Sequence, residues 1–143
     1  FSHIQAKVEK ILFATREARR KLTLLIEEDA QAYREVSKAF KLKKDTQRAI
    51  KKAIKVPLKI AELCLFLIKF CPFLIEKANP NLRSDAFIAE ELLYTGFNCA
   101  LRNIEINQKY LINKDFSKKL DKKLKKMKSQ IERIHKLVKG RKL

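Results

Sequence analysis

The sequence predicts an all-α protein, built as an antiparallel bundle of long helices. Its 143 residues include only two glycines and three prolines. Lysine, leucine, isoleucine, alanine and glutamate are abundant and tryptophan is absent, a composition that favours helices. Apolar residues recur at steps of three and four, as in helices that bury one face. A chain of this length forms one domain, residues 1–143, with a core of its own.

The first helix is expected from about residue 3 to residue 40. Its inward stripe repeats at a mean near 3.6 residues, which predicts a straight rod of about 60 Å. Asp29 stands in the middle of this stripe, where a hydrophobic residue is the usual choice. The stripe comprises Ile4, Val8, Ile11, Thr15, Ala18, Leu22, Leu25, Asp29, Tyr33, Val36 and Phe40.

The second helix follows a basic connector, KLKKD, and is expected to be capped by Asp45 or Thr46. Pro57 and Pro72 should kink or break it, because each lacks a backbone donor and crowds the preceding turn. Its inward residues are Ala49, Ala53, Ile60, Cys64, Leu67 and Cys71.

The third helix follows a turn at residues 78–81 and is expected to start with Ser84 as its cap and to end near Asn113. Its predicted inward stripe again mixes polar and small apolar residues: Asp85, Ala89, Leu92, Gly96, Ala100, Asn103 and Asn107. The last helix is expected over about residues 116–139, with lysines outside one apolar face. That face comprises Phe116, Leu120, Leu124, Met127, Ile131, Ile134 and Val138. Long helices in a small chain leave part of their apolar surface exposed, so we expect a homodimer.

The three cysteines show no CxxC spacing, and Cys64 and Cys71 lie on an apolar face, so we expect buried free thiols in a reducing, cytoplasmic setting. No signal peptide is recognisable. The apolar run 56–75 has about the length of a membrane span. It contains Lys59, Glu62 and Lys69, so we interpret it as a core helix and expect no membrane partner.

The formal charge of +18 is concentrated in two blocks. Residues 41–60 carry eight basic side chains and one acid, and residues 111–143 carry thirteen basic side chains and three acids. Such blocks form either a solvated lysine-rich face or a surface that attracts polyanions. The basic runs lack interleaved aromatic residues and a recognition motif, which argues against a nucleic-acid-binding bundle.

Buried carboxylates and amides are costly unless they are hydrogen-bonded, so polar residues on two inward stripes predict a site between these helices. No metal constellation is recognisable, since His3 and His135 stand at opposite ends of the chain on faces expected to be solvated. Nucleophile-elbow, Walker and dinucleotide motifs are also absent from the sequence. Asp29 and Asp85 remain as the candidates for charge and proton chemistry.

Each candidate also has a structural interpretation. Asp85 in a first helical turn favours the helix dipole. Asn103 and Asn107 could set the register of a dimer. A basic side chain from another helix could satisfy Asp29.

Three stretches together resemble the cyclodeaminase/cyclohydrolase family: LIEEDAQAYREVSKAFKL, RAIKKAIKVPLKIAEL and ANPNLRSDAFIAEELLYTGFNCALRNIEIN. They occur in the family's order over about residues 17–115. The family includes formiminotetrahydrofolate cyclodeaminase and methenyltetrahydrofolate cyclohydrolase. The resemblance therefore implies an all-helical homodimer in one-carbon metabolism that binds a reduced folate and needs no cofactor beyond the tetrahydrofolate substrate.

The resemblance implies one of two reactions: hydrolysis of 5,10-methenyltetrahydrofolate, or loss of ammonia from 5-formiminotetrahydrofolate. Both pass through a cationic group, which preplaced carboxylates would stabilise. On this interpretation Asp29 and Asp85 are catalytic. The implied substrate-binding residues, with lysines for a polyglutamate tail, are Tyr33, Asn81, Ser84, Asn103, Asn107, Lys51, Lys52 and Lys55.

One departure from the family pattern bears on activity. The family commonly opens with a helix pair carrying a glycine-rich segment, which nothing here matches, and it commonly has glycine where Ala78 stands. We expect that an N-terminal part of the family domain is missing from this chain. The alternative functions are therefore a non-catalytic helical binding or scaffold relative and, on charge alone, a nucleic-acid-binding bundle.

Overall fold

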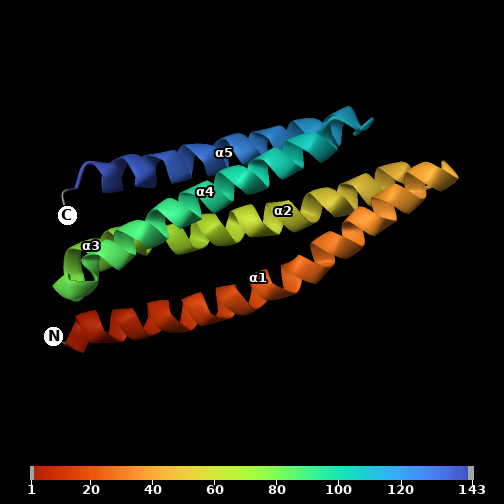
Figure 1. Ribbon diagram of the computed structural model, residues 1–143. Coiled ribbons are helices and arrows are strands. Elements are labelled where there is room, and N and C mark those ends of the chain that lie inside the picture. The colour runs from red at the N-terminus through yellow and green to blue at the C-terminus, as the bar shows by residue number, and fades with distance from the viewer. Residues whose placement is uncertain (1, 142–143) are drawn as a thin grey trace.

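The computed structural model describes residues 2–141, and these residues form helices joined by short connections (Figure 1). No strand occurs within this range. The all-α prediction is thereby confirmed. The elements are α1 (Ser2–Leu42), α2 (Thr46–Ile68), α3 (Cys71–Lys77), the 3-10 turn η1 (Pro80–Leu82), α4 (Arg83–Gln108) and α5 (Lys114–Lys139).

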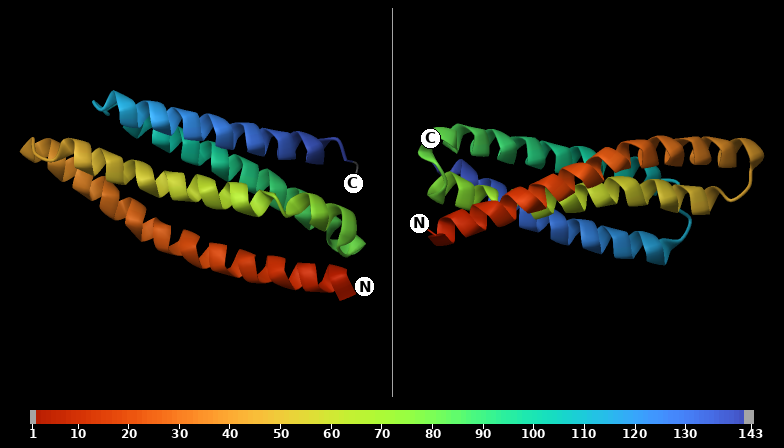
Figure 2. Two further views of the ribbon diagram at one scale, coloured as in Figure 1. Left: turned by 180° about the vertical axis from the view of Figure 1, so that it is seen from behind. Right: turned by 90° about the horizontal axis from the view of Figure 1, so that it is seen from below.

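Helix α2 lies at the centre of the bundle, with α1 on one side and α4 on the other, and α5 lies along α4 (Figures 1 and 2). Successive long helices run in opposite directions, as predicted. Because α2 has neighbours on several sides, it buries residues around most of its circumference rather than along one stripe. The main core joins α2, α3, α4 and α5, and a smaller cluster around Leu25, Ala32, Ala53 and Val56 joins α1 to α2.

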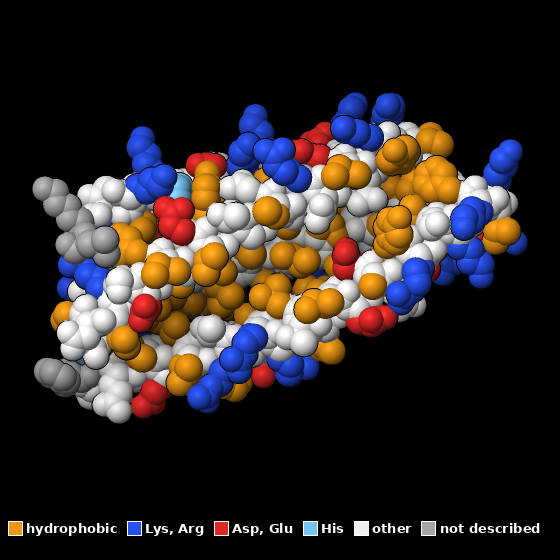
Figure 3. All heavy atoms as spheres, in the orientation of Figure 1, with side chains coloured by type: hydrophobic (Ala, Val, Ile, Leu, Met, Phe, Trp, Pro, Cys, Tyr) orange, Lys and Arg blue, Asp and Glu red, His pale blue; other side chains and the backbone are white. Residues whose placement is uncertain are grey.

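Helix α1 is curved, not the straight rod that its sequence pattern predicted (Figures 1 and 2). Its buried residues are Ile11, Ala18, Leu25, Ala32 and Ala39, which recur every seven residues. A seven-residue repeat keeps facing one partner only if the helix supercoils around it, so α1 winds along α2. Toward its N-terminus α1 diverges from the other helices, and hydrophobic side chains line the hollow between them (Figure 3).

The prolines and helix ends refine the predicted boundaries. Pro57 is buried inside α2 without ending it, whereas the helix stops at Ile68 and Pro72 lies in the first turn of α3. The predicted membrane-length run is therefore divided between two helices. Among the residues described, no helix is both long enough and apolar enough to cross a membrane.

One predicted cap position is confirmed and the other is wrong. Asp45 occupies the N-cap position of α2 with φ 57°, but its side chain makes no capping hydrogen bond. Ser84 is already helical, because the η1 turn leads directly into α4 at Arg83. Helix α4 also ends earlier than predicted, at Gln108, and the Asn113 side chain caps α5 by accepting a hydrogen bond of 2.9 Å from the Phe116 N–H.

Candidate functional site

Two ion pairs set the register between α1 and α2 near the middle of the bundle. Lys59 Nζ lies 2.9 Å from Glu28 Oε2, and Lys52 Nζ lies 2.6 Å from Glu35 Oε1. These antiparallel pairs place Asp29 beside about residue 58 of α2, and they place Tyr33, one turn further along α1, beside about residue 54.

Two contacts set the register between α2 and α4. A Cβ on Gly96 would lie 3.3 Å from Cys64 Sγ, so the helices approach closely there. At the other end, Gln47 Nε2 donates to the Tyr110 carbonyl at 2.9 Å, and the Ile112 N–H donates to Gln47 Oε1 at 2.9 Å. Interpolation between these contacts puts Asn103 and Asn107 beside about residues 50–57 of α2.

Four of the predicted site residues therefore lie at one level of the bundle, on the two helices that flank α2: Asp29, Tyr33, Asn103 and Asn107. The helical period puts Asp29 and Tyr33 on the same side of α1 as Phe40. Phe40 packs edge-on against Tyr110, just beyond α4, with ring centroids 5.8 Å apart. We call these four residues the mid-bundle cluster because of their common level; among residues 2–141 no hydrogen bond or ion pair joins the two on α1 to the two on α4.

Pro57 of α2 lies at the same level as the mid-bundle cluster. Because proline has no N–H, the carbonyl of Ala53 lacks the donor that the fourth following residue of a helix normally provides. Helix α2 therefore lacks one of its regular backbone hydrogen bonds at this level.

The mid-bundle cluster is open in a single chain, which corrects the prediction of buried carboxylates. Asp29 and Asn103 are exposed, Tyr33 is 75% exposed and Asn107 is half-buried, with its Nδ2 donating to the Asn103 carbonyl at 2.9 Å. Among residues 2–141, Asp29 has no ion pair and no side-chain hydrogen bond, so the basic partner considered for it is not present there. The buried line of α1 passes through Leu25 and Ala32 and leaves Asp29 at its edge.

Asp85, Asn81 and Ser84 lie at the opposite end of α4 and are exposed. Asp85 is in the first turn, and eighteen residues separate it from Asn103, or about 27 Å along the helix axis. The Asn81 N–H is bonded to Asn79 Oδ1 at 3.0 Å, inside the turn. One chain therefore does not bring Asp29 and Asp85 into a common site.

Lys51, Lys52 and Lys55, which were expected to bind a polyglutamate tail, line a groove on the side of α2 that faces α1 and α5. The groove has a volume of about 820 Å³. Lys51 Nζ lies 5.0 Å from the centre of the Phe116 ring, and Lys52 pairs with Glu35. Arg48, Lys51 and Lys55 have no ion pair within residues 2–141. We call this the basic groove; its lining residues are Glu28, Gln31, Arg48, Lys51, Lys52, Lys55, Val56, Lys59 and Phe116.

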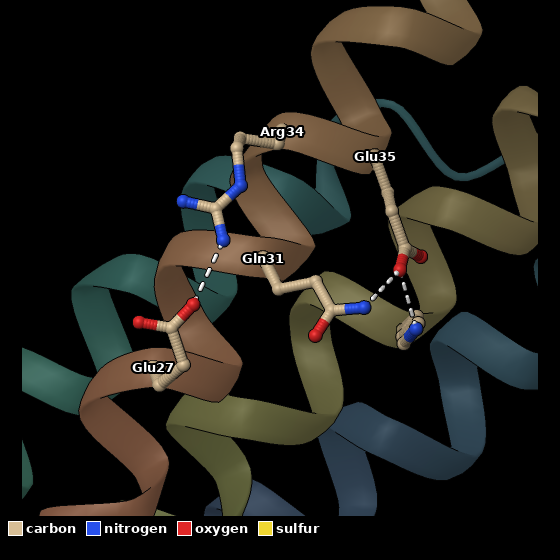
Figure 4. A network of polar contacts seen from close by, with 5 residues as sticks. Glu27, Gln31, Arg34 and Glu35 are labelled. Carbon is tan, nitrogen blue, oxygen red and sulfur yellow. Dashed lines mark hydrogen bonds and ion pairs between the residues drawn. The ribbon is translucent and has the colours of Figure 1, made fainter.

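Polar contacts on α1 lie both at the basic groove and on the outer face of the helix. Gln31 Nε2 donates to Glu35 Oε1 at 3.2 Å, and Arg34 donates to Glu27 Oε1 at 2.9 Å (Figure 4). The pKa of Glu35 lies below its ordinary value because Lys52 donates a hydrogen bond to it. Asp29 and Tyr33 are not among the lining residues, so one chain keeps the lysines apart from the mid-bundle cluster.

The basic groove continues into an apolar groove between the N-terminal half of α1 and α2. Glu28 and Lys59 border both grooves, and the second has a volume of about 790 Å³. Phe13, Leu24 and Phe66 line it, with exposed fractions of 70%, 55% and 46%. One chain therefore leaves a large apolar surface beside the candidate site.

One polar pair was missed by the sequence analysis, which placed His135 on a solvated face. His135 is buried, and its Nδ1 lies 2.9 Å from Oε1 of Glu90, which is also buried. The sequence spacing could have indicated that His135 is buried. It lies four residues after Ile131 and three before Val138, on the apolar face predicted for the last helix.

The cysteines agree with the prediction of free thiols, which is confirmed for Cys64 and Cys71. Burial raises the pKa of Cys64 to about 11 and that of Cys71 to about 12. Cys99 lies on α4 and is exposed. Neither buried thiol is available as a nucleophile near neutral pH.

Comparison with known proteins gives concordant results. The profile of the formiminotransferase-cyclodeaminase family matches residues 1–126. The methenyltetrahydrofolate cyclohydrolase of Methylorubrum extorquens is 30% identical, over 99% of this chain and 75% of that protein. The formimidoyltransferase-cyclodeaminase of Sus scrofa is 33% identical over 76% of this chain, which corresponds to 22% of that longer protein.

A solved structure matches over nearly the whole chain. The crystal structure of formiminotetrahydrofolate cyclodeaminase from Thermotoga maritima superposes with a TM-score of 0.94 at 31% identity. The match covers 98% of this chain and 71% of that one.

Proposed function

The chain belongs to the formiminotransferase-cyclodeaminase family, and from this premise we propose that it acts on a tetrahydrofolate derivative as a cyclohydrolase or a cyclodeaminase. The observation that carries the proposal is the mid-bundle cluster, where a carboxylate without an ion pair, a phenol and two amides lie at one level of the bundle. The two reactions are hydrolysis of 5,10-methenyltetrahydrofolate and release of ammonia from 5-formiminotetrahydrofolate.

Asp29 is the proposed catalytic carboxylate of the cluster. A methenyl bridge carries a delocalised positive charge, and a formimino group must be cationic before it releases ammonia. A carboxylate that is not already neutralised by a lysine or arginine can stabilise either cation and can also accept or deliver a proton.

The other members of the cluster are suited to hold the pterin ring. Tyr33 stands one turn from Asp29 and offers a ring face and a hydroxyl. The Asn103 side chain can both donate and accept, as the edge of a pterin requires, and the amide of Asn107 is oriented by its bond to the Asn103 carbonyl.

The basic groove is the proposed binding surface for a polyglutamate tail. Arg48, Lys51 and Lys55 keep their charges free of ion pairs within the described chain, and a chain of glutamates is a polyanion. Lys52 already pairs with Glu35, so we expect a smaller contribution from it.

A second copy of the chain is the proposed cover for the open cluster. Catalysis on a cationic folate requires a site from which most water is excluded, and a single chain leaves Asp29 and Asn103 exposed. Asp85, with Asn81 and Ser84, can share a site with Asp29 only if another copy supplies one of the two groups. The exposed apolar side chains along the adjacent groove provide surface for such a homodimer.

The test is a spectrophotometric assay with both substrates. The protein is added to 5,10-methenyltetrahydrofolate, and loss of its near-ultraviolet band is compared with the spontaneous rate; with 5-formiminotetrahydrofolate, the appearance of the same band is followed. Asp29→Asn should lower the rate of whichever reaction occurs by about 10²-fold or more. Glu27→Gln, two residues away on an outer face of α1, is the matched control and should retain the rate.

The outcomes separate the proposed functions. Acceleration of one reaction that Asp29→Asn abolishes identifies the activity. Unchanged turnover in Asp29→Asn contradicts the role of this carboxylate. Saturable folate binding without acceleration of either reaction would favour the non-catalytic binding relative.

A further inference from the structure

Two acidic residues of α4 and one histidine of α5 meet away from the mid-bundle cluster. One donor atom each from Glu90, Glu91 and His135 lies within 4.8 Å of the others. Glu90 is 1% exposed and His135 is 8% exposed. We propose that these three residues bind a divalent transition-metal ion of the zinc type, and that the bound metal fastens α5 to α4.

The spacing of the first two donors suits a shared metal ion. His135 Nδ1 and Glu90 Oε1 are 2.9 Å apart. Two ligands about 2.1 Å from one zinc ion, at angles between a right angle and the tetrahedral angle, are separated by about 3.0–3.4 Å. An ion can therefore replace the proton between these atoms with a shift of a few tenths of an ångström.

One carboxylate oxygen of Glu90 lacks a hydrogen-bond partner among the residues described. This atom, Oε2, is buried. A buried carboxylate oxygen without a partner is costly, so nearly all such atoms are paired in folded proteins. Coordination by both oxygens of Glu90 would satisfy it.

The histidine ring is held in place by its neighbours. Tyr94 stacks on it with ring centroids 3.7 Å apart and planes inclined by 2°. The Tyr94 hydroxyl donates to Glu132 Oε1 at 2.8 Å, which anchors the tyrosine. Such outer contacts orient an imidazole before a metal binds and raise the affinity of the site.

Glu91 and the adjacent cavity complete an open site. Glu91 is exposed, so its carboxylate can rotate toward the ion. A cavity of about 650 Å³ borders His135 and leaves room for water as a further ligand. The lining of this cavity includes Glu132 and the cations Arg133, Lys136 and Lys139, whereas Glu90 and Glu91 are not part of it.

The donor set indicates the class of metal. Calcium and magnesium take oxygen ligands, whereas an imidazole with two carboxylates suits zinc, cobalt or nickel. His135 also lies beyond residue 126, where the match to the family profile ends. The proposed site therefore joins one residue outside the matched range to two residues, Glu90 and Glu91, inside it.

The experiment measures Zn²⁺ binding by calorimetry and Co²⁺ binding by visible absorption, in a Cys99→Ser background that removes the exposed thiol. We expect one ion per chain, and a rise of about 5 °C or more in Tm at Zn²⁺ concentrations a hundredfold above Kd. Glu91→Gln should weaken binding about tenfold or more, and His135→Gln should abolish it. His3→Gln and Glu105→Gln, at exposed positions, are matched controls and should bind like the parent.

Glu91→Gln keeps the proposal testable even if His135→Gln fails to fold, because position 91 is on the surface. The proposal is overturned if the parent binds no Zn²⁺ at 100 µM free ion, which would leave Glu90 and His135 as a hydrogen-bonded pair only. It is equally overturned if Glu91→Gln binds with the affinity of the parent. Neither readout requires turnover of a folate, so failure here is distinct from failure of the proposed function.

Discussion

The mid-bundle cluster and the Glu90–His135 pair use polar residues in opposite ways. Asp29 and Asn103 lie on exposed positions of two helices, and Asp29 has no partner within residues 2–141. Glu90 is fully enclosed and bonded to His135, which is itself stacked on Tyr94. A polar group that the chain satisfies internally contributes to the packing of that chain, whereas one held open on a rigid helix remains available to a ligand or a second copy.

Removing one member of the Glu90–His135 pair should strongly destabilise the fold. His135→Leu leaves the Glu90 carboxylate buried without its partner, and we expect the free energy of unfolding to fall by about 3–5 kcal/mol in metal-free buffer. Urea denaturation followed by circular dichroism measures this. Replacing both residues, as Glu90→Leu with His135→Leu, should recover much of the loss because no charge then remains buried.

Urea denaturation of an Asp29 variant should show a much smaller change in stability. Asp29→Asn removes an exposed charge that has no ion pair, so we expect the free energy of unfolding to change by no more than about 0.5 kcal/mol. A loss comparable to that of His135→Leu would show that Asp29 is structural, and it would remove the contrast between the two regions.

A substitution at Asn103 tests whether the mid-bundle cluster binds folate or sets the register of a dimer. We expect Asn103→Leu to weaken folate binding about tenfold, because a site built around an amide loses a hydrogen-bonding partner. Titration of a folate measures this, and sedimentation reports the oligomeric state in parallel. A changed oligomeric state with intact folate binding would instead assign Asn103 to the register of a dimer.

The basic groove should show a smaller effect that depends on the substrate. Lys51→Gln combined with Lys55→Gln should raise KM several-fold for a polyglutamylated folate and leave KM for the monoglutamate unchanged, since only the longer tail reaches the lysines. The difference should shrink as salt is raised. Lys10→Gln combined with Lys38→Gln, on α1, serves as the charge-matched control. Equal effects on both substrates would contradict a tail-binding role.

The reactivity of the three cysteine thiols toward alkylation reports which of them are buried in the core. Cys64 and Cys71 have pKa values of about 11 and 12, so at pH 8 almost none of either thiol is ionised, and both should resist alkylation until the chain unfolds. Cys99 is exposed and should react first. Mass spectrometry of the labelled protein gives the order. Rapid labelling of Cys64 in the folded chain would show that α2 and α4 separate readily.

The sequence pattern was reliable for the outer helix α5. The apolar face of α5 was predicted correctly, because α5 lies on the outside of the bundle and buries a single stripe. The same reasoning was wrong for α1, whose seven-residue repeat was interpreted as a straight helix, and for the inward stripe of α4. Asp85, Leu92 and Asn103 of that stripe are exposed in this chain, and the buried residues of α4 lie on a neighbouring face around Phe97 and Ile104.

The helical class, the order and approximate limits of the helices, and the family could be read from the sequence, because composition, periodicity and linear motifs are local properties of the chain. Packing of the helices was needed to show that Asp29 and Asn103 reach one level of the bundle, that Asp85 does not, and that His135 meets Glu90. These relations depend on helix register, and register is set by contacts such as Glu28–Lys59 and Gly96–Cys64 between segments more than thirty residues apart. No local pattern specifies such contacts, which is why the chemistry of the site emerged only from the packed bundle.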